Sequence, residues 1–359
     1  MKKVKYISLA VLALLSLVSC KGNLDPDNPN KGSKASLPKG ISIKIEPGAD
    51  NSANMHFTDA VLTGNVVLVG NPELLPSDYY GNVSAVLSYG TNPEELSTEA
   101  NCTLGEPVTD YWSVTIPYEA KLSGLNPGQQ YYFSVYAFYG GEKPFKSDLV
   151  KFFTFTDGPI DLGLKSGLLW ASCNLGATYP EDSGAYYAWA EVSPKAEYDW
   201  ATYAWCVWEK KTFGLTKYCN FDIWGWEGFT DNLVTMESAD DAATAKLGAG
   251  WRTPTAADWE ELGDDCDWQA ATINGAQGWL VRSKANTEEK LNVIFLPCTG
   301  YIDGTEKIGT DTGVYWSSSV YTSSCFQAQG LVFTASGEHA IDFSHIRAHG
   351  LAIRPVKAK

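Results

Sequence analysis

LSGLNPGQQYYFSVYA, residues 122–137, is the stretch that decides the fold of the N-terminal half of this chain. Pro127 and Gly128 favour a tight turn, and the residues after them alternate between two faces, as they do in a strand. Tyr131 can turn its ring inward while its hydroxyl bonds a backbone group upstream, which closes a corner between two sheets. Three side chains share the inner face at a spacing of two: Phe133, Val135 and Ala137. The stretch therefore predicts the corner of a β-sandwich.

The rest of residues 40–157 has the same pattern, in which short runs of alternating apolar and polar residues are separated by Gly, Pro, Asn and Asp. The runs are 41–45, 60–68, 83–89, 112–117, 131–139 and 149–155. This spacing is typical of a β-sandwich. Residues 122–137 resemble the corner of a fibronectin type III domain, and the resemblance covers most of 40–157. It implies a domain that serves as a spacer at least as often as it binds.

The N-terminus has the pattern of an export signal. Three lysines precede an apolar run at 7–18 that is too short to span a bilayer as a helix, so residues 1–19 are predicted to be a signal peptide. Leu17-Val18-Ser19-Cys20 resembles the lipobox of bacterial lipoproteins. The resemblance implies cleavage before Cys20 and acylation of its thiol, as in palmitate-bearing lipoproteins, which would anchor the protein to a membrane.

Residues 20–39 are rich in Pro, Gly, Asn, Ser and charge, so they are predicted to form a lipidated flexible stalk. The chain has 27 basic and 42 acidic residues, a net charge of −15, and no stripe of Lys and Arg. This balance argues against nucleic acid as a partner, because phosphate binding needs clustered positive charge. Neutral sugars and proteins are not disfavoured.

The amino-acid composition changes at Asp157-Gly158-Pro159, after which tryptophan, glycine and tyrosine are frequent. Two short helices are predicted. Ser238 and Asp241 stand at capping-box spacing before a helix that runs to about Leu247, and Thr255 and Asp258 repeat that spacing before a second helix. The second helix would place two apolar side chains on one face: Trp259 and Leu262.

Ordered phrases across 158–356 carry a second resemblance. They are Asp161-Leu-Gly-Leu164, Leu169-Trp170-Ala171, Cys173-Asn174-Leu-Gly176, Pro180-Glu181-Asp182, Tyr187-Ala188-Trp189, Gly250-Trp251-Arg252-Thr-Pro254, Phe295-Leu296-Pro297, Gly300-Tyr301, Tyr315-Trp316-Ser317, Arg347 and Ile353-Arg354-Pro355-Val356. Together they resemble the Fibrobacter succinogenes major paralogous domain, common in surface lipoproteins of gut Bacteroidota. The resemblance implies a C-type-lectin-like α+β domain over 158–359, so the expected fold class is mainly β. Four tryptophans of these phrases are expected in the core: Trp170, Trp251, Trp259 and Trp316.

Tryptophan is densest between residues 186 and 229, and Ile223-Trp224-Gly-Trp226-Glu-Gly-Phe229 has the composition of a loop. Exposed tryptophans suit glycan recognition, because aromatic faces stack on the apolar C–H face of sugars. The candidate ligand-binding residues are Trp205, Trp208, Trp224 and Trp226. A long insertion folded back over the core would have the same composition. The Glu-Pro-Asn, Gln-Pro-Asp and Trp-Asn-Asp motifs of the lectin calcium site are absent from the sequence, so calcium-dependent sugar binding is not expected.

Six cysteines of the second module would be free to pair after export. Candidate pairs are Cys206–Cys219, Cys173–Cys266 and Cys298–Cys325. Six cysteines permit fifteen pairings, and buried free thiols are an open alternative.

The sequence predicts a binding or adhesion module on a lipoprotein, which recognises a glycan or a protein from the outer membrane and is expected to face the cell surface. The alternative is a structural component of an envelope complex, such as a nutrient-uptake system or a pilus. His345 and His349 have a zinc-like spacing but no Glu partner, so no metal or other cofactor is predicted. The chain has no nucleophile elbow and no phosphate-binding loop, and it is predicted not to be an enzyme.

Overall fold

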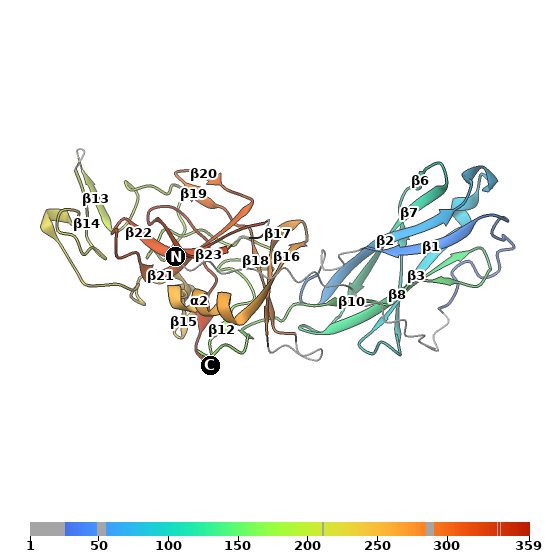
Figure 1. Ribbon diagram of the computed structural model, residues 1–359, viewed down its shortest axis with the longest axis horizontal. Helices are drawn as coiled ribbons and strands as arrows, with labels where there is room; N and C mark the ends of the chain where they lie inside the picture. Colours follow the sequence, from blue (N-terminus) through green and yellow to red (C-terminus); the bar gives the residue numbers. More distant parts are fainter. Residues whose placement is uncertain (1–25, 49–54, 210–211, 285–290, 336, 338) are drawn as a thin grey trace.

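The computed structural model describes residues 26–48, 55–209, 212–284, 291–335, 337 and 339–359. The predicted signal peptide and the predicted lipidation site Cys20 lie outside the described residues. The described chain is mainly β, as expected, and forms an elongated molecule with one group of sheets at each end (Figure 1). Within these ranges, no helix has the length and apolarity that crossing a bilayer requires.

The N-terminal half is a sandwich of two sheets. The first sheet contains β1 (Ser42–Pro47), β2 (Asp59–Val69), β7 (Ser113–Ser123), β5 (Thr103–Leu104) and β6 (Val108–Thr109). The second contains β10 (Val150–Phe153), β8 (Gln130–Tyr139), β3 (Val83–Gly90), β4 (Thr98–Asn101) and β9 (Phe145–Lys146). Apolar side chains from both sheets form one buried cluster between them. The six predicted runs all contain strands, whereas the short edge strands β4, β5, β6 and β9 were missed.

The predicted corner is confirmed. Asn126 N–H donates to the Tyr131 hydroxyl over 2.8 Å, and the ring of Tyr131 is buried. The turn passes the chain from β7 in one sheet to β8 in the other, with Gly128 at a φ of +66° that favours glycine. The three residues predicted to share the inner face are fully buried: Phe133, Val135 and Ala137.

The segment before β1 packs on the sandwich. The Asn28 side chain donates to Gly140 O over 3.0 Å, and the Asn30 side chain donates to Asn82 O over 2.8 Å. Leu37 N–H donates to the Glu142 carboxylate. Residues 28–37 are therefore held by the body of the protein, and the stalk predicted through residue 39 is too long. Composition alone assigns these residues to the stalk, but two asparagine side chains in the segment bind backbone carbonyls of the sandwich.

The C-terminal half contains several small sheets. Its first and last strands share one sheet, made of β11 (Ile160–Asp161), β12 (Leu169–Trp170), β24 (Val356–Lys357) and β15 (Trp251–Arg252). Two three-stranded sheets follow, one of β16 (Cys266–Ile273), β17 (Ala276–Ser283) and β18 (Val293–Pro297), the other of β21 (Thr312–Val320), β22 (Gln327–Thr334) and β23 (His339–Ile346). Two hairpins complete the half: β13–β14 (Cys206–Glu209, Thr212–Leu215) and β19–β20 (Tyr301–Asp303, Glu306–Ile308).

Both predicted helices are present, α1 (Ala242–Leu247) and α2 (Ala256–Asp265). Thr255 and Asp258 form a reciprocal capping box, and α2 buries Trp259 and Leu262 as predicted. The cap of α1 is Asp241, whose side chain accepts from Ala243 N–H, so the cap expected to start at Ser238 is wrong. Of the four tryptophans expected in the core, Trp170, Trp259 and Trp316 are fully buried, whereas Trp251 is half-buried at the surface.

The sheet of β16, β17 and β18 lies between two cores, and its strands β17 and β18 are mostly buried on both faces. On one face, four side chains join the buried cluster of the sandwich: Ile273, Leu280, Val293 and Phe295. On the other face, five join the core of the C-terminal half: Cys266, Trp279, Val281, Ile294 and Leu296. Because successive residues of a strand point to opposite faces, one sheet can serve both cores. We call this sheet the shared wall.

A polar cluster centred on His56 ties the two halves together beside the shared wall. The His56 imidazole bonds Asp59 of its own half over 2.9 Å and Glu181 of the other half over 2.8 Å. The Tyr179 ring stacks on the imidazole with centroids 4.3 Å apart, and the Asn274 side chain donates to the same Glu181 oxygen. Partial burial lowers the pKa of His56, but the hydrogen bonds and charges of Asp59 and Glu181 outweigh it and raise the pKa above 6.5.

This tie should respond to pH. A raised folded-state pKa means that the stabilisation is fully present below about pH 6.5 and is lost as the pH rises through the folded-state pKa. We expect the melting temperatures of the wild type and of His56→Gln to differ more at about pH 5.5 than at about pH 8.5. Differential scanning calorimetry at both pH values measures this, and an equal difference at both would contradict the assignment.

Candidate functional site

The β13–β14 hairpin lies at the end of the molecule opposite the sandwich (Figure 1). Aromatic side chains gather on this hairpin and the neighbouring loop. The Phe213 ring lies between two tryptophans: its centroid is 5.7 Å from that of Trp208 and 6.1 Å from that of Trp224, with interplanar angles of 32° and 26°. Trp208 is 51% exposed and Trp224 is 40% exposed. We call these three residues the aromatic row. It presents two partly exposed indole rings to solvent.

Two further rings support the aromatic row from below. The Phe326 ring meets Trp224 edge-on, with centroids 5.0 Å apart, and lies 5.5 Å from Phe213. Trp200 in turn meets Phe326 edge-on at 5.7 Å. Edge-to-face contacts of this kind are favourable and leave each ring one orientation. The exposed rings are therefore held in place before any ligand arrives.

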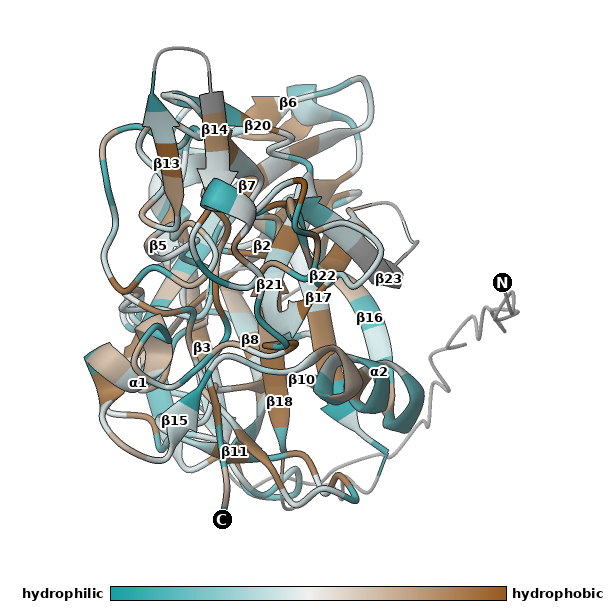
Figure 2. Cartoon of the chain, turned by 90° about the vertical axis from the view of Figure 1, so that its left-hand side faces the viewer, coloured by the Kyte–Doolittle hydropathy of each residue, from teal (hydrophilic) through white to brown (hydrophobic). Residues whose placement is uncertain are grey.

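The backbone fixes the positions of the row. Trp208 and Phe213 are directly opposite each other in the β13–β14 hairpin, which projects in Figure 2, so their rings meet as a cross-strand pair. Trp224 lies in a loop that is bonded to the hairpin through Leu215 N–H and Trp224 O, 2.9 Å apart. Gly214 of β14 allows this approach, because a Cβ there would lie 2.6 Å from the Cα of Trp226. Glu227 in the same loop has a φ of +54°, which marks a constrained turn.

The four predicted ligand-binding tryptophans do not all lie in one place. The structure brings Trp208 and Trp224 together, on either side of Phe213. The Trp205 indole instead packs inward, where it donates to Ala190 O over 2.8 Å and lies under the Lys217 ammonium. Trp205 therefore lies outside the aromatic row, and its role as a ligand residue stays a prediction. Trp226 is half-buried in the 3-10 turn η3 (Trp226–Gly228), outside the row.

A buried arginine organises the base of this end. Arg347 is fully buried, donates to Cys325 O over 2.7 Å and Tyr218 O over 2.9 Å, and also bonds Lys217 O and the Tyr203 hydroxyl. Its guanidinium also lies 4.9 Å from the centroid of the Trp189 ring. One side chain therefore ties three stretches of chain that carry the aromatic row: 203–208, 217–224 and 325–326.

The predicted disulfides are not present. All seven cysteines of the described ranges are free thiols. Cys298 and Cys325 pack in different clusters, Cys298 against the core of the C-terminal half and Cys325 beside Cys219 beneath the aromatic row. Cys206 packs against the same cluster as Cys219, yet both are free thiols. Cys219 and Cys325 share a hydrogen bond, and burial, followed by that contact, raises the pKa of Cys325 to about 12. The Cys325 thiol is therefore protonated and unreactive at neutral pH.

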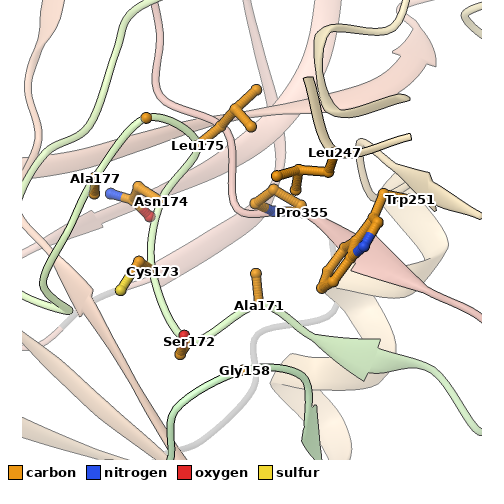
Figure 3. Close-up of a pocket in the computed structure, with 11 residues that line it drawn as sticks. Gly158, Ala171, Ser172, Cys173, Asn174, Leu175, Ala177, Leu247, Trp251 and Pro355 are labelled. Carbon is orange, nitrogen blue, oxygen red and sulfur yellow. The ribbon is translucent and has the colours of Figure 1, made fainter. Parts of the chain in front are cut away.

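A small pocket of about 200 Å³ opens near residue 158 (Figure 3). Leu247, Trp251 and Pro355 form its apolar wall, and Cys173 and Asn174 lie on the opposite strand of chain. Burial raises the pKa of the Cys173 thiol despite the nearby charge of Arg354, so the thiol is not activated. The pocket is small for a binding site that would enclose a ligand.

His345 and His349 do meet, although not on a helix. Their rings bond each other over 3.0 Å, and His349 also approaches Asp303 at 3.3 Å. Burial, then the neighbouring His349, lowers the pKa of His345 to about 4, so the pair is neutral at physiological pH. In the part of the chain that the structure describes, no group of three or more His, Cys, Asp or Glu side chains could hold a metal ion.

No family model matches this chain, and no curated protein matches its sequence. Among solved structures, the matches include an uncharacterized Listeria monocytogenes protein in complex with glucose, magnesium and calcium, and a cycloalternan-forming enzyme from Listeria monocytogenes in complex with a pentasaccharide substrate. Each has 10% sequence identity and a TM-score of 0.23, and covers 85% of this chain and 21% of that chain. The chain thus spans about a fifth of those proteins.

The prediction that this chain is not an enzyme is contradicted by these matches and is withdrawn, because one of them is an enzyme. That prediction rested on missing nucleophile and phosphate motifs, which are signatures of only some enzyme classes. A likeness at this TM-score carries no argument for a particular reaction.

Proposed function

We propose that this protein is a lipid-anchored lipoprotein of the outer membrane whose aromatic row binds glycans at the cell surface. The observation that carries the proposal is the row itself, in which two exposed tryptophans flank one phenylalanine and Phe326 packs against Phe213 and Trp224. Sugar rings have apolar C–H faces that stack on such surfaces. The sequence resemblances imply a fibronectin type III-like spacer and a C-type-lectin-like C-terminal domain, and this arrangement would suit the role.

Electrostatics support a neutral ligand. The chain has a net charge of −15, and the described residues beside the row include the exposed carboxylates of Glu209, Asp222 and Glu227. Carboxylates accept hydrogen bonds from sugar hydroxyls, but repel anionic ligands. We therefore propose neutral hexose-containing glycans rather than sulfated or sialylated ones.

The test is a glycan and mucin array probed with the mature protein and with Trp208→Ala, Trp224→Ala. Removing both rings should weaken binding by about 10- to 100-fold, because each well-placed aromatic contact contributes about 1 kcal/mol. The matched control is Tyr111→Ala, Trp112→Ala, which removes two rings at the opposite end that are more exposed than Trp208 and Trp224, and should bind normally. Absence of any glycan binding by the unmutated protein would overturn the proposal.

A second candidate is a structural role in an envelope complex. Around the aromatic row, further apolar side chains are exposed: Ile223 at 75%, Val234 at 58% and Phe229 at 37%. A surface of this kind also suits a protein partner. If the array shows no binding and the Trp208→Ala, Trp224→Ala variant loses an envelope partner that cross-links to the wild type in cells, the assembly role is favoured.

A further inference from the structure

The end of the sandwich remote from the aromatic row also has exposed aromatic side chains. Tyr111 and Trp112, in the turn between β6 and β7, are 82% and 60% exposed and pair edge-to-face with centroids 5.6 Å apart. Three more exposed apolar side chains lie at this end: Val69, Leu74 and Val108. Single exposed apolar residues are ordinary, but five at one end of a sandwich suggest a surface that is covered in the working protein. We call these five residues the membrane tip.

The chain enters the sandwich at this same end. Asn28 and Asn30 bind the backbone of Gly140 and Asn82, just beyond the end of β8 and just before β3. At this end β1 begins beside the last residue of β2, Val69, and the next residue, Gly70, donates its N–H to Trp112 O over 2.9 Å. The first described residues and the membrane tip therefore lie at one end of the sandwich.

The distance to the predicted anchor is short. Cys20 precedes Pro26 by six residues, and six residues can span at most about 20 Å when fully extended. If Cys20 is acylated, its acyl chains hold this end of the sandwich within about that distance of the bilayer surface. The opposite end, with the aromatic row, would then lie farthest from the membrane (Figure 1).

The local charge also suits a lipid surface. Three lysines are exposed on the segment that leads to β1, in a chain that is otherwise acidic: Lys31, Lys34 and Lys39. Two carboxylates are nearest in sequence to the membrane tip: Glu73 and Asp110. Among the three lysines, Lys31 lies 3.8 Å from the carboxylate of Asp27. Ammonium groups at this position can contact lipid phosphates.

We propose that the membrane tip docks into the headgroup region of the bilayer that holds the acyl chains, and so sets the protein upright with its aromatic row facing outward. Trp and Tyr favour this region because their rings are apolar and their N–H and O–H groups are polar. An acyl anchor and an apolar tip together hold one orientation that neither holds alone. The inference rests on the lipid anchor of the proposed function.

The experiment uses the acylated mature protein, which begins at Cys20, in vesicles of phosphatidylethanolamine with a minor fraction of phosphatidylglycerol. Flotation reports whether the protein is anchored, and hydroxyl-radical footprinting read by mass spectrometry reports which side chains are covered. We expect oxidation of Tyr111 and Trp112 to fall by about fivefold or more in vesicles relative to the protein in detergent-free buffer, since headgroup burial excludes bulk water. Oxidation of Trp208 and Trp224 should not change, which provides an internal control.

The variant Tyr111→Ser, Trp112→Ser should still float, because Cys20 is unchanged, but it should lose the protection of Leu74. If the protein floats but Tyr111 and Trp112 are not protected, the docking of the membrane tip is contradicted, while the lipid anchor is supported. Failure of the wild type to float overturns both the anchor and the docking, while the glycan array tests the aromatic row separately.

Discussion

Arg354→Met should lower the free energy of unfolding by about 3–5 kcal/mol, because it removes one partner of a buried, charged hydrogen-bond network. Arg354 is fully buried. Its guanidinium donates to Ala171 O, Ser172 O and Phe295 O at 2.6–3.0 Å, and to the Asn174 side chain at 2.9 Å. Methionine has a similar length and fills most of the space, so the loss measures the hydrogen bonds rather than a cavity.

Urea denaturation followed by tryptophan fluorescence measures this loss. The matched control is Arg354→Lys, which keeps the positive charge but cannot reach four acceptors at once, and should fall between the wild type and Arg354→Met. A loss below about 1 kcal/mol for Arg354→Met would show that water replaces the guanidinium at these carbonyls.

Arg347→Met should cause a loss of similar size, about 3–5 kcal/mol, and should also abolish ligand binding at the aromatic row. Arg347 bonds the carbonyls of Cys325 and Tyr218 and the hydroxyl of Tyr203, so its loss leaves buried acceptors without a donor. The stretches that carry Trp224 and Phe326 would then no longer be held together.

The expected result combines two measurements on one variant: reduced stability in urea, and array binding at a temperature where the variant is still folded. Unchanged binding by folded Arg347→Met would show that the rings hold the row without the arginine. Arg347→Lys serves as the control, because one ammonium can satisfy some of the carbonyls and should preserve part of both properties.

The parts of the fold that follow local rules could be predicted from the sequence. The Tyr131 corner depends on a turn and the strand that follows it, and the cap of α2 depends on Thr255 and Asp258, three residues apart. Both were predicted correctly. The sequence also contains an indication of the shared wall that the prediction did not include. Val293–Pro297 is a continuous apolar run, which is typical of a strand buried on both faces.

The aromatic row could be predicted only in part. The density of tryptophan indicated the region, but exposure depends on contacts that are remote in sequence. Trp205 and Trp208 are three residues apart, and one packs on Ala190 O while the other faces solvent. Phe326 reaches the row from more than 100 residues away, after β21. No local pattern identifies such a partner.

The shared wall has a mechanical consequence. A force applied by a ligand to the aromatic row of an anchored molecule would pass directly from one half to the other. No flexible linker would absorb it, because one sheet belongs to both cores. The His56 cluster and the contact of the Arg282 guanidinium with the Phe153 ring, 5.1 Å from its centroid, brace the same joint. The molecule would therefore transmit force as a single strut, so that tension applied at the ligand is felt at the membrane.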